Sequence, residues 1–308
     1  MTQSAFHQPV LGAELLRLAP GAVRIVDGTL GDGGHARLFL ERGATVLGID
    51  RDPEALRRAQ TRLGDERIRY LASSTFGGAT LAAIAAFHPD LILLDLGVSS
   101  RQLDDDRLGF SFRLGAALDM RMARVGPSAA DRLAGATAAE LESWFRDYGD
   151  ERRARRLATE IVRRRERAPL LISDDLVNAI RAALGPRTGP ADFARLFQAV
   201  RIAVNDELAG LAGALVPLRD ALTPGGALAV ISYHSGEDRL VKNAFRDWSA
   251  HCVCPPHLPV CVCRGQPLGR VVTRRPVVAG PDEVGANPRA RSAKLRVFEV
   301  AADGAATS

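Results

Sequence analysis

The sequence predicts an α/β protein whose mostly parallel sheet is interrupted by an inserted helical domain. Short apolar runs that end in a carboxylate alternate with helical stretches over the first hundred residues or so, a rhythm typical of a parallel sheet covered by helices on both faces. A long, mostly helical stretch follows, after which the strand rhythm returns. We therefore expect one sheet domain formed by residues 1–103 and 204–308, with a helical substrate-recognition domain at 104–203 between its two parts.

The first part of the sheet is predicted from four apolar runs. VRIVD (23–27) leads into the glycine-rich loop GTLGDGGH and the helical stretch ARLFLERG, so this segment forms strand, tight loop and helix. TVLGID (45–50) leads into a helix that begins at Pro53. RIRYLA (67–72) and DLILLD (90–95) supply the third and fourth strands.

The helical insertion and the second part of the sheet follow from the same periodicities. Helical apolar spacing is found in ELESWFRDYG, ERRARRLATEIVRRR, SDDLVNAIRAAL and FARLFQAVRIAVNDELAGL. A turn then introduces a buried strand at 227–232, which leads into the helix EDRLVKNAFRDW. KLRVFEV (294–300) closes the sheet, and the small, polar tail AADGAATS is expected to fray.

Composition restricts the class of protein more than its partner. The formal charge of +5 and the isoelectric point near 9.4 suit an acidic partner such as nucleic acid. Lys242 and Lys294 are the only lysines among 41 basic residues, a skew that a GC-rich gene also produces, so the charge favours RNA only slightly over a small substrate. No apolar run approaches the roughly 20 residues of a membrane span. The opening MTQSAFHQPV lacks the regions of a secretory signal, so we expect a soluble cytoplasmic protein.

The loop after the first strand carries the main chemical signal. Glycines let a backbone approach a nucleotide closely, and ligands of such folds bind outside the carboxyl ends of the strands. The dinucleotide fingerprint G-x-G-x-x-G is missing, which argues against a nicotinamide oxidoreductase. Asp27 and Asp32 would repel a pyrophosphate and suit a cofactor with positive charge, such as a sulfonium with its amino group. The remaining pocket residues of this loop are the glycines Gly31, Gly33 and Gly34.

That loop resembles the glycine-rich motif of S-adenosylmethionine-dependent methyltransferases, with Thr29 where the motif usually has its first glycine. A structural turn is the alternative. Asp50 ends the second strand, where a carboxylate can accept hydrogen bonds from both ribose hydroxyls, although an exposed strand-end aspartate is also common. Phe76 follows the third strand and either stacks near adenine or fills a core. Asp95 ends the fourth strand and is the best single catalytic candidate.

Longer motifs extend this resemblance over most of the chain. The chain is similar to the RsmH (MraW) family of ribosomal RNA cytidine N4-methyltransferases in a series of segments, in order: HQPVL, DGTLGDGGH, IDRDP, ILLDLGVSSRQLDD, GFSF, LDMRM, FQAVRIAVN, SYHSGEDR and NPRARSAKLR. The resemblance implies a Rossmann-like class I methyltransferase sheet with an inserted helical domain. It also implies the cofactor S-adenosyl-L-methionine and methylation of N4 of a cytidine in the decoding centre of small-subunit (16S) ribosomal RNA.

The resemblance also implies a set of site residues and shows where this chain departs from the family. The implied cofactor contacts are Gly33, Gly34, His35, Asp50, Phe76, Asp95 and Gln102. Leu30 and Asp32 vary the first loop. Tyr233 stands where the family often has Phe, and Gly236 where it often has Leu. Erosion of Gly33, Asp50 and Asp95 would have indicated an RNA-binding assembly factor without activity, and all three are present.

The reaction requires a proton acceptor near the substrate amine, because the exocyclic nitrogen of cytosine shares its lone pair with the ring. An acceptor that hydrogen-bonds the amine would localise this lone pair and hold it in line with the methyl donor. Asp95 is the first candidate, and His234 is the second, with a structural role as its alternative. Ser232, at the end of the fifth strand, could also face the pocket. Ser99 and Ser100 either contact the substrate or form turns.

Substrate RNA must bring a base into the pocket, with phosphate contacts that offset the cost of flipping it out. Arginines of the segment 152–167 flank an apolar stripe of Ala154, Leu157, Ala158 and Ile161, so they face water and pair with glutamates or bind RNA. We rank a terminal cluster first as RNA contacts: Arg289, Arg291, Lys294 and Arg296. The partner is small-subunit RNA, in an assembled or assembling subunit, and the oligomeric state is left open, a homodimer included.

Four cysteines lie close together near the end of the chain: Cys252, Cys254, Cys261 and Cys263. Their C-x-C, six-residue, C-x-C array can bind zinc tetrahedrally, with His251 and His257 nearby. The pairs are tighter than the usual C-x-x-C knuckle, and methyl transfer needs no metal. Zinc and unpaired loop thiols both stay open, and we assign no metal to the site.

Overall fold

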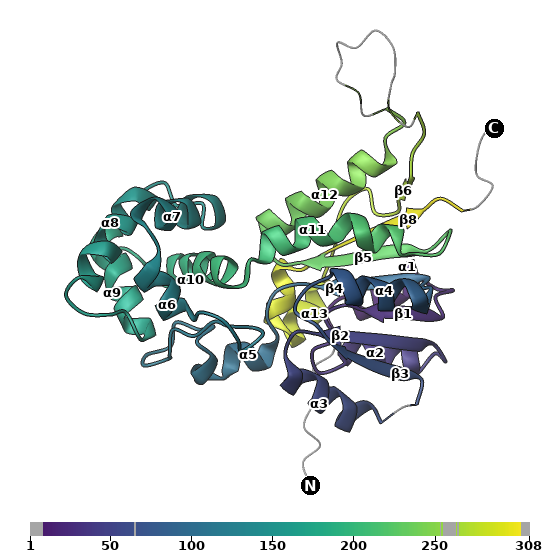
Figure 1. Cartoon of the computed structure of the whole chain (residues 1–308), viewed down its shortest axis with the longest axis horizontal. Helices are drawn as coiled ribbons and strands as arrows, with labels where there is room; N and C mark the ends of the chain where they lie inside the picture. The colour runs from purple at the N-terminus through teal and green to yellow at the C-terminus, as the bar shows by residue number, and fades with distance from the viewer. Residues whose placement is uncertain (1–8, 65, 253, 255–262, 264, 303–308) are drawn as a thin grey trace. The chain divides into compact units, whose positions relative to one another are not determined.

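The computed structural model describes residues 9–64, 66–252, 254, 263 and 265–302, and it divides into two compact units (Figure 1). The first unit combines the chain up to Gly97 with the chain from Ala209 onward, and the second unit runs from Val98 to Leu208. The insertion expected at 104–203 therefore lies within the second unit, which begins and ends slightly further out. Each unit is described by itself below.

The first unit is built on a mixed sheet in the strand order β3-β2-β1-β4-β5-β8-β6, with β7 also paired to β8. The described strands are β1 (Arg24–Asp27), β2 (Thr45–Asp50), β3 (Ile68–Ala72), β4 (Leu91–Asp95), β5 (Ala227–Ser232), β6 (Gly269–Val271), β7 (Val277–Val278) and β8 (Lys294–Val300). Strands β3, β2, β1, β4 and β5 are mutually parallel, whereas β8 is antiparallel to β5. The predicted α/β sheet is confirmed, and its order reverses between β1 and β4.

Sequence patterns located the six long strands and missed the two short ones. The strands predicted at 45–50, 227–232 and 294–300 have those bounds in the structure. Strands β6 and β7 have three and two residues, which is too short for an alternating pattern to be visible. They form because β8 pairs with them through backbone hydrogen bonds along the edge that does not face β5. This pairing depends on the tertiary structure.

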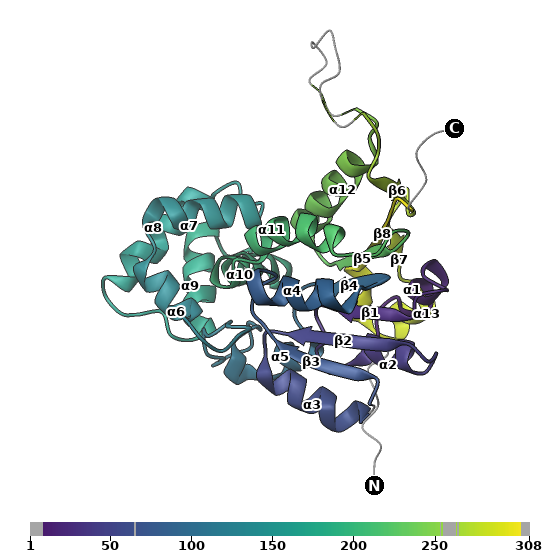
Figure 2. The ribbon, with the colours of Figure 1, turned by 45° about the vertical axis from the view of Figure 1, so that its right-hand side comes forward.

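Helices cover both faces of this sheet, because successive side chains of a strand point to opposite sides (Figure 2). Ile25 packs in one core with residues of α1 (Gly12–Leu18), α2 (Gly34–Leu40) and α3 (Pro53–Leu63). The next residue, Val26, packs in a second core. Three helices supply that second core, and they are α4 (Gly78–Phe87), α11 (Glu207–Asp220) and α12 (Ser235–Ser249).

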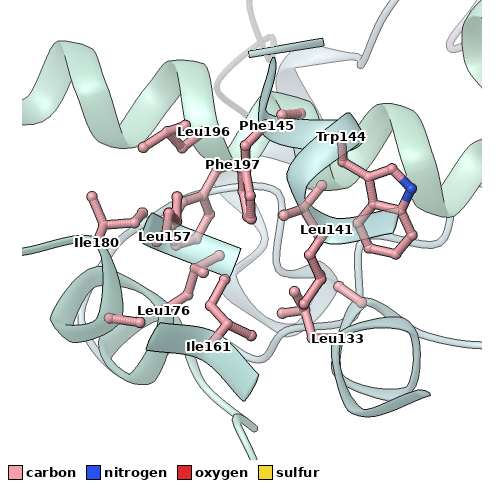
Figure 3. Packing of buried hydrophobic residues seen from close by; sticks show 14 of the residues in the cluster. Leu133, Leu141, Trp144, Phe145, Leu157, Ile161, Leu176, Ile180, Leu196 and Phe197 are labelled. Carbon is pink, nitrogen blue, oxygen red and sulfur yellow. The ribbon is translucent and has the colours of Figure 1, made fainter. Parts of the chain in front are cut away.

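The second unit is helical and has a core of its own (Figure 3). Its helices are α5 (Ser100–Asp104), α6 (Ala129–Gly135), α7 (Ala138–Ser143), α8 (Ala154–Arg165), α9 (Ser173–Leu184) and α10 (Pro190–Asn205), with a 3-10 turn η1 (Asp106–Leu108) and a π-helical turn η2 (Trp144–Tyr148). The stripe predicted on α8 is buried at all four positions, including Leu157 and Ile161. None of the described helices combines the length and apolar character needed to cross a lipid bilayer.

A helix break near the boundary of the two units differs from the sequence expectation. The stretch 193–211 reads as one helix, but α10 ends at Asn205, and Asp206 adopts a left-handed conformation with φ of 49°. The Asn205 side chain donates to the Met120 carbonyl at 2.7 Å and accepts from the Met122 backbone N–H at 2.9 Å. These contacts come from a distant segment, so periodicity could not reveal the break.

The core of the helical unit can be tested at Leu157, which is fully buried. Replacing it with alanine should lower the free energy of unfolding by about 3 kcal/mol, because contacts are lost and a cavity remains. Urea denaturation followed by circular dichroism measures this loss. The control Leu114→Ala, at a side chain that is 89% exposed, should change stability by less than about 0.5 kcal/mol. Equal losses in the two variants would contradict the packing described.

Candidate active site

Three aspartates mark the carboxyl ends of three neighbouring parallel strands. Asp27 ends β1, Asp50 ends β2 and Asp95 ends β4, and β1 lies between the other two strands. The strand order reverses between β1 and β4, which is where ligands bind in open α/β sheets. The fold therefore brings the three predicted carboxylates to one edge of the sheet, at the position that favours a ligand.

The loop after β1 requires glycine at two positions for steric reasons. A Cβ added to Gly28 would lie 2.7 Å from Leu94 Cδ2 and 3.0 Å from Phe76 Cζ. Gly33 has φ of 80° and caps α2, and its added Cβ would lie 2.7 Å from Leu63 Cδ1. The loop is thus held tightly against its neighbours, and the first backbone N–H groups of α2 follow directly, at Gly34 and His35.

Side-chain hydrogen bonds join this loop to the strands on both sides. The Asp50 carboxylate accepts from the backbone N–H of Gly31 at 2.7 Å and from that of Asp52 at 2.8 Å. On the other side, the Asp95 backbone N–H donates to Thr29 Oγ1 at 2.6 Å. Thr29 replaces a glycine of the usual motif, and its hydroxyl explains the departure, because it fixes the loop to the end of β4.

Asp27 is a buried carboxylate with an unused acceptor. Its side chain is 1% exposed, and Oδ1 accepts only a long hydrogen bond of 3.3 Å from the Thr29 N–H. Oδ2 is buried and has no hydrogen-bond partner among the described residues. Burial raises the pKa of Asp27 to about 6, although the nearby His35 opposes this effect. A buried acceptor without a partner is costly, so this carboxylate suits a ligand that brings a donor or a positive charge.

The charge of Asp32, the other carboxylate of this loop, is already balanced by an arginine. The Arg58 Nε donates to Asp32 Oδ1 at 2.8 Å, so the predicted repulsion of a pyrophosphate rests on Asp27 and Asp50. Burial also raises the pKa of Asp50, and its two backbone hydrogen bonds oppose the rise. These acceptors fit S-adenosylmethionine, whose cationic groups would meet the free oxygen of Asp27 and whose ribose hydroxyls would donate to Asp50.

Asp95 is oriented by Tyr233 and lies beside His35, both residues of the same unit. Tyr233, which directly follows β5, donates its hydroxyl to Asp95 Oδ1 at 2.8 Å. The His35 Nδ1 lies 3.7 Å from Asp95 Oδ2, while its Nε2 lies 2.9 Å from the Val10 carbonyl oxygen. A carbonyl only accepts, so Nε2 of His35 carries a hydrogen. The Asp95 side chain is 24% exposed, which leaves its carboxylate within reach of a substrate.

Burial affects the protonation of both Asp95 and Tyr233. Burial raises the pKa of Asp95, against the opposing effects of His35 and the Tyr233 hydrogen bond. Burial and the negative charge of Asp95 raise the pKa of Tyr233, so the hydroxyl keeps the proton that it donates. Tyr233 was noted from the sequence only as a departure from the family. Its contact with Asp95, 138 residues away, had no signal in the sequence.

Comparison with known proteins decides the family. A model of the MraW methylase family matches residues 4–301. This chain belongs to the MraW methylase family. The resemblance seen in the sequence motifs is thereby confirmed, and with it the prediction of a methyltransferase that uses S-adenosylmethionine.

Individual relatives of this MraW-family chain agree over nearly its whole length. The Ribosomal RNA small subunit methyltransferase H of Gemmatimonas aurantiaca is 56% identical over 306 residues, which cover 96% of each chain. The protein of the same name from Pelobacter propionicus is 47% identical over 309 residues, covering 95% of this chain and 98% of the relative. Among solved structures, the N-methyltransferase NodS of Bradyrhizobium japonicum WM9 covers 94% of both chains at 11% identity and a TM-score of 0.40.

His234 has a structural position in this member of the MraW methylase family. It caps α12, with Nδ1 accepting from the backbone N–H groups of Gly236 at 3.2 Å and Glu237 at 3.4 Å. Its Nε2 lies 3.2 Å from a carboxylate oxygen of Glu237. The nitrogen that would take a proton from substrate is therefore already an acceptor. This geometry argues against the predicted catalytic role of His234 and favours its structural alternative.

Two further predicted cofactor contacts have different surroundings. Phe76 is partly buried and packs on the core that contains Val26, with its ring edge close to Gly28. It fills a core position, and stacking near adenine stays a prediction. Gln102 belongs to the helical unit. Its amide oxygen accepts from the Ser99 backbone N–H at 2.8 Å and completes a capping box at α5.

The predicted RNA-binding cluster does not present four available cations. Arg296 is 8% exposed, and its Nε donates to Asp238 Oδ1 at 2.7 Å. Lys294 lies 3.6 Å from the same carboxylate. Burial would raise the pKa of Asp238, but the hydrogen bond and charge of Arg296 outweigh it and lower the pKa. This burial argues against a phosphate contact for Arg296. Arg291 is exposed on the 3-10 turn η3 (Pro288–Ser292), and Arg289 is partly buried there.

The raised pKa of Asp27 makes stability depend on pH. With a pKa of 3.8 unfolded and about 6 folded, the folded state holds an extra proton between these values, so raising the pH through this window removes stability. The isosteric variant Asp27→Asn does not titrate. Its stability relative to the wild type should rise by about 2 kcal/mol from pH 4 to pH 7, measured by urea denaturation at each pH.

A matched control for this measurement is Asp282→Asn, at an exposed position of the same unit. Its stability relative to the wild type should change little over the same pH range. A difference between Asp27→Asn and wild type that stays constant with pH would show that the Asp27 carboxyl titrates normally, and the electrostatic description of the site would be wrong.

Proposed function

We propose that this chain transfers a methyl group from S-adenosylmethionine to N4 of a cytidine in the decoding centre of small-subunit ribosomal RNA. The observation that carries the proposal is the Asp95 carboxylate, which Tyr233 orients at the switch point of the sheet beside the glycine loop. Membership of the MraW methylase family and relatives named for the ribosomal small subunit support the choice of acceptor.

The chemistry of the acceptor explains why a carboxylate is needed. The N4 amine of cytosine is a poor nucleophile, because its lone pair is delocalised into the ring. One oxygen of Asp95 is engaged by Tyr233, and Oδ2 would accept a hydrogen of the amine, which localises the lone pair and fixes its direction. When bound, the cofactor supplies an electrophilic methyl group on a sulfonium. Asp95 then holds the amine in line and takes up its proton.

Binding of the cofactor is assigned to residues of the glycine loop and the strand ends. Gly33, Gly34 and His35 would contribute backbone groups, since the His35 ring is engaged with Val10 and lies beside Asp95. Asp50 would accept hydrogen bonds from the ribose, because each carboxylate oxygen can accept more than one. Phe76 would border the adenine, and Asp27 would face a cationic group. Gln102 stays a proposed contact on the strength of the family motif.

RNA phosphates would be bound by exposed arginines, of which the helical unit offers more than the terminal cluster. Along α8 and the turn before it, Arg152, Arg155 and Arg156 are exposed, and no ion pair within the described residues engages them. Arg163 and Arg164 instead pair with Glu160 at 2.7 Å. We therefore rank the first group, together with Arg291, above the paired arginines as phosphate contacts.

The proposal also covers the assembly state of the RNA substrate and the oligomeric state of the enzyme. The target is the RNA of an assembled or assembling subunit in the cytoplasm, and a homodimer is a compatible form of the enzyme. The alternative function is methylation of another RNA or of a small molecule, which the pocket by itself would allow. Only the acceptor distinguishes these functions, so the decisive experiment identifies the methylated product.

Methyl transfer should be measured with labelled S-adenosylmethionine and small subunits from a strain that lacks this gene, followed by nucleoside analysis. We expect label in N4-methylcytidine. Asp95→Ala should reduce kcat by at least about a hundredfold, because positioning and proton acceptance are lost together. Cofactor binding without any label in RNA would contradict the proposed acceptor and favour a small molecule.

The variant Tyr233→Phe is the matched control, because it keeps the Asp95 carboxylate and removes only the hydrogen bond that orients it. It should lower kcat less than Asp95→Ala does and shift the pH dependence of kcat, since the Tyr233 hydroxyl contributes to the pKa of Asp95. Identical kcat values and pH profiles for Tyr233→Phe and wild type would show that this contact does not assist catalysis.

The exposed arginines can be tested by charge reversal. The double variant Arg155→Glu, Arg156→Glu should weaken binding of the RNA substrate on the order of tenfold or more, because phosphate contacts dominate such affinities. Its affinity for S-adenosylmethionine should be unchanged. RNA binding is measured by filter retention at two salt concentrations, with Arg163→Glu as the control at a position already paired with Glu160. Equal loss in both would exclude a specific role for Arg155 and Arg156.

A further inference from the structure

Three cysteine sulfurs gather at one point outside the active site. The Sγ atoms of Cys252, Cys254 and Cys263 all lie within 4.8 Å of one another, and those of Cys252 and Cys263 are 3.9 Å apart. Cys252 and Cys254 shortly follow α12, whereas Cys263 shortly precedes β6. The cluster therefore joins the two ends of the segment that connects α12 with β6.

The sulfur separations match those of a metal thiolate centre. Zinc binds thiolates at about 2.3 Å in a tetrahedron, which places neighbouring sulfurs about 3.8 Å apart. A disulfide would instead need about 2.05 Å between two sulfurs, and none of the three cysteines forms one. The distance between Cys252 and Cys263 is thus close to the edge of a zinc tetrahedron and far from a disulfide bond.

Packing does not explain why the sulfurs converge. A cysteine that serves packing is usually among the most buried residues of a protein, but Cys252 is exposed and the other two are only partly buried. None of the three is a member of the apolar cores of the sheet unit. Their common property is soft thiolate chemistry, which selects zinc over hard cations.

We propose that Cys252, Cys254 and Cys263 bind a structural zinc ion. A fourth ligand would complete the tetrahedron. Cys261, the remaining member of the two C-x-C pairs, lies outside the described residues. The ion is not catalytic. It binds beyond the last turn of α12, whereas Tyr233 and Asp95 lie near the first turn, and the 15 residues of this helix span roughly 20 Å.

The zinc ion would secure the end of α12 against the sheet. Trp248, in the last turn of that helix, accepts a hydrogen bond from the Leu268 backbone N–H at 2.8 Å. The Trp248 ring packs against Phe245 and against Phe298 of β8 at centroid distances of 5.5 and 5.2 Å. A metal that joins the two ends of the connecting segment would hold these contacts in place by reducing the freedom of the chain around them.

Metal content of the full-length protein tests this inference directly. Protein purified without chelators from zinc-supplemented cells should contain about one zinc ion per chain by mass spectrometry. Cys252→Ser, Cys254→Ser and Cys263→Ser should each lose most of the metal, whereas His251→Ala, at an exposed neighbouring residue, should retain it. Cobalt added to the metal-free protein should give the intense visible absorption of tetrahedral thiolate coordination.

Removal of zinc by a chelator should lower the melting temperature of the wild type by several degrees, and the triple serine variant should show no such shift. Circular dichroism and binding of S-adenosylmethionine establish that the variants are folded. The inference is overturned if the wild type holds no more zinc than the triple variant and gives no cobalt spectrum. Retention of a full equivalent of zinc by the triple variant would overturn it equally, because the ion would then lie elsewhere.

Discussion

The loop after β1 is the element on which the site depends, because it ties three strand ends together. Its Thr29 hydroxyl accepts from the Asp95 backbone at the end of β4, and its Gly31 N–H donates to Asp50 at the end of β2. Glycine at position 33 permits both the left-handed turn and the close approach of Leu63. With these contacts, three carboxylates keep fixed positions at the switch point, where the parallel sheet offers space for a ligand.

These carboxylates are held in a way that costs stability in the absence of a ligand. Burial raises the pKa of Asp27, Asp50 and Asp95, and Asp27 keeps an acceptor without a partner. A cationic cofactor would compensate that cost and favour the ionised form. Asp95 differs because Tyr233 supplies a neutral donor that orients the carboxylate without neutralising it. The two carboxylates therefore differ in their partners, which suits the proposed roles of Asp27 toward the cofactor and of Asp95 toward the substrate.

Helix α12 connects the substrate side of the site with the edge of the sheet. At its first turn His234 and Glu237 cap the helix, and Glu237 also accepts from the Tyr233 backbone at 2.8 Å. At its last turn Trp248 packs on Phe245 and β8. The cysteine cluster follows directly. A zinc ion there would stabilise the same helix whose first turn holds the Tyr233 backbone. The capping contacts of His234 favour the structural alternative that the sequence left open for it.

The sequence by itself determined the α/β architecture, the six long strands and the edge at which Asp27, Asp50 and Asp95 meet, because periodicity and strand-end position are local properties. Family motifs added the reaction and its cofactor. Only the tertiary structure decided which polar groups are already engaged: Arg296 with Asp238, His234 with its helix, Asp32 with Arg58, and Tyr233 with Asp95. Such pairings join residues through space or through cap geometry, and a charge or hydroxyl in a sequence has the same letter whether its partner is a ligand, water or another side chain.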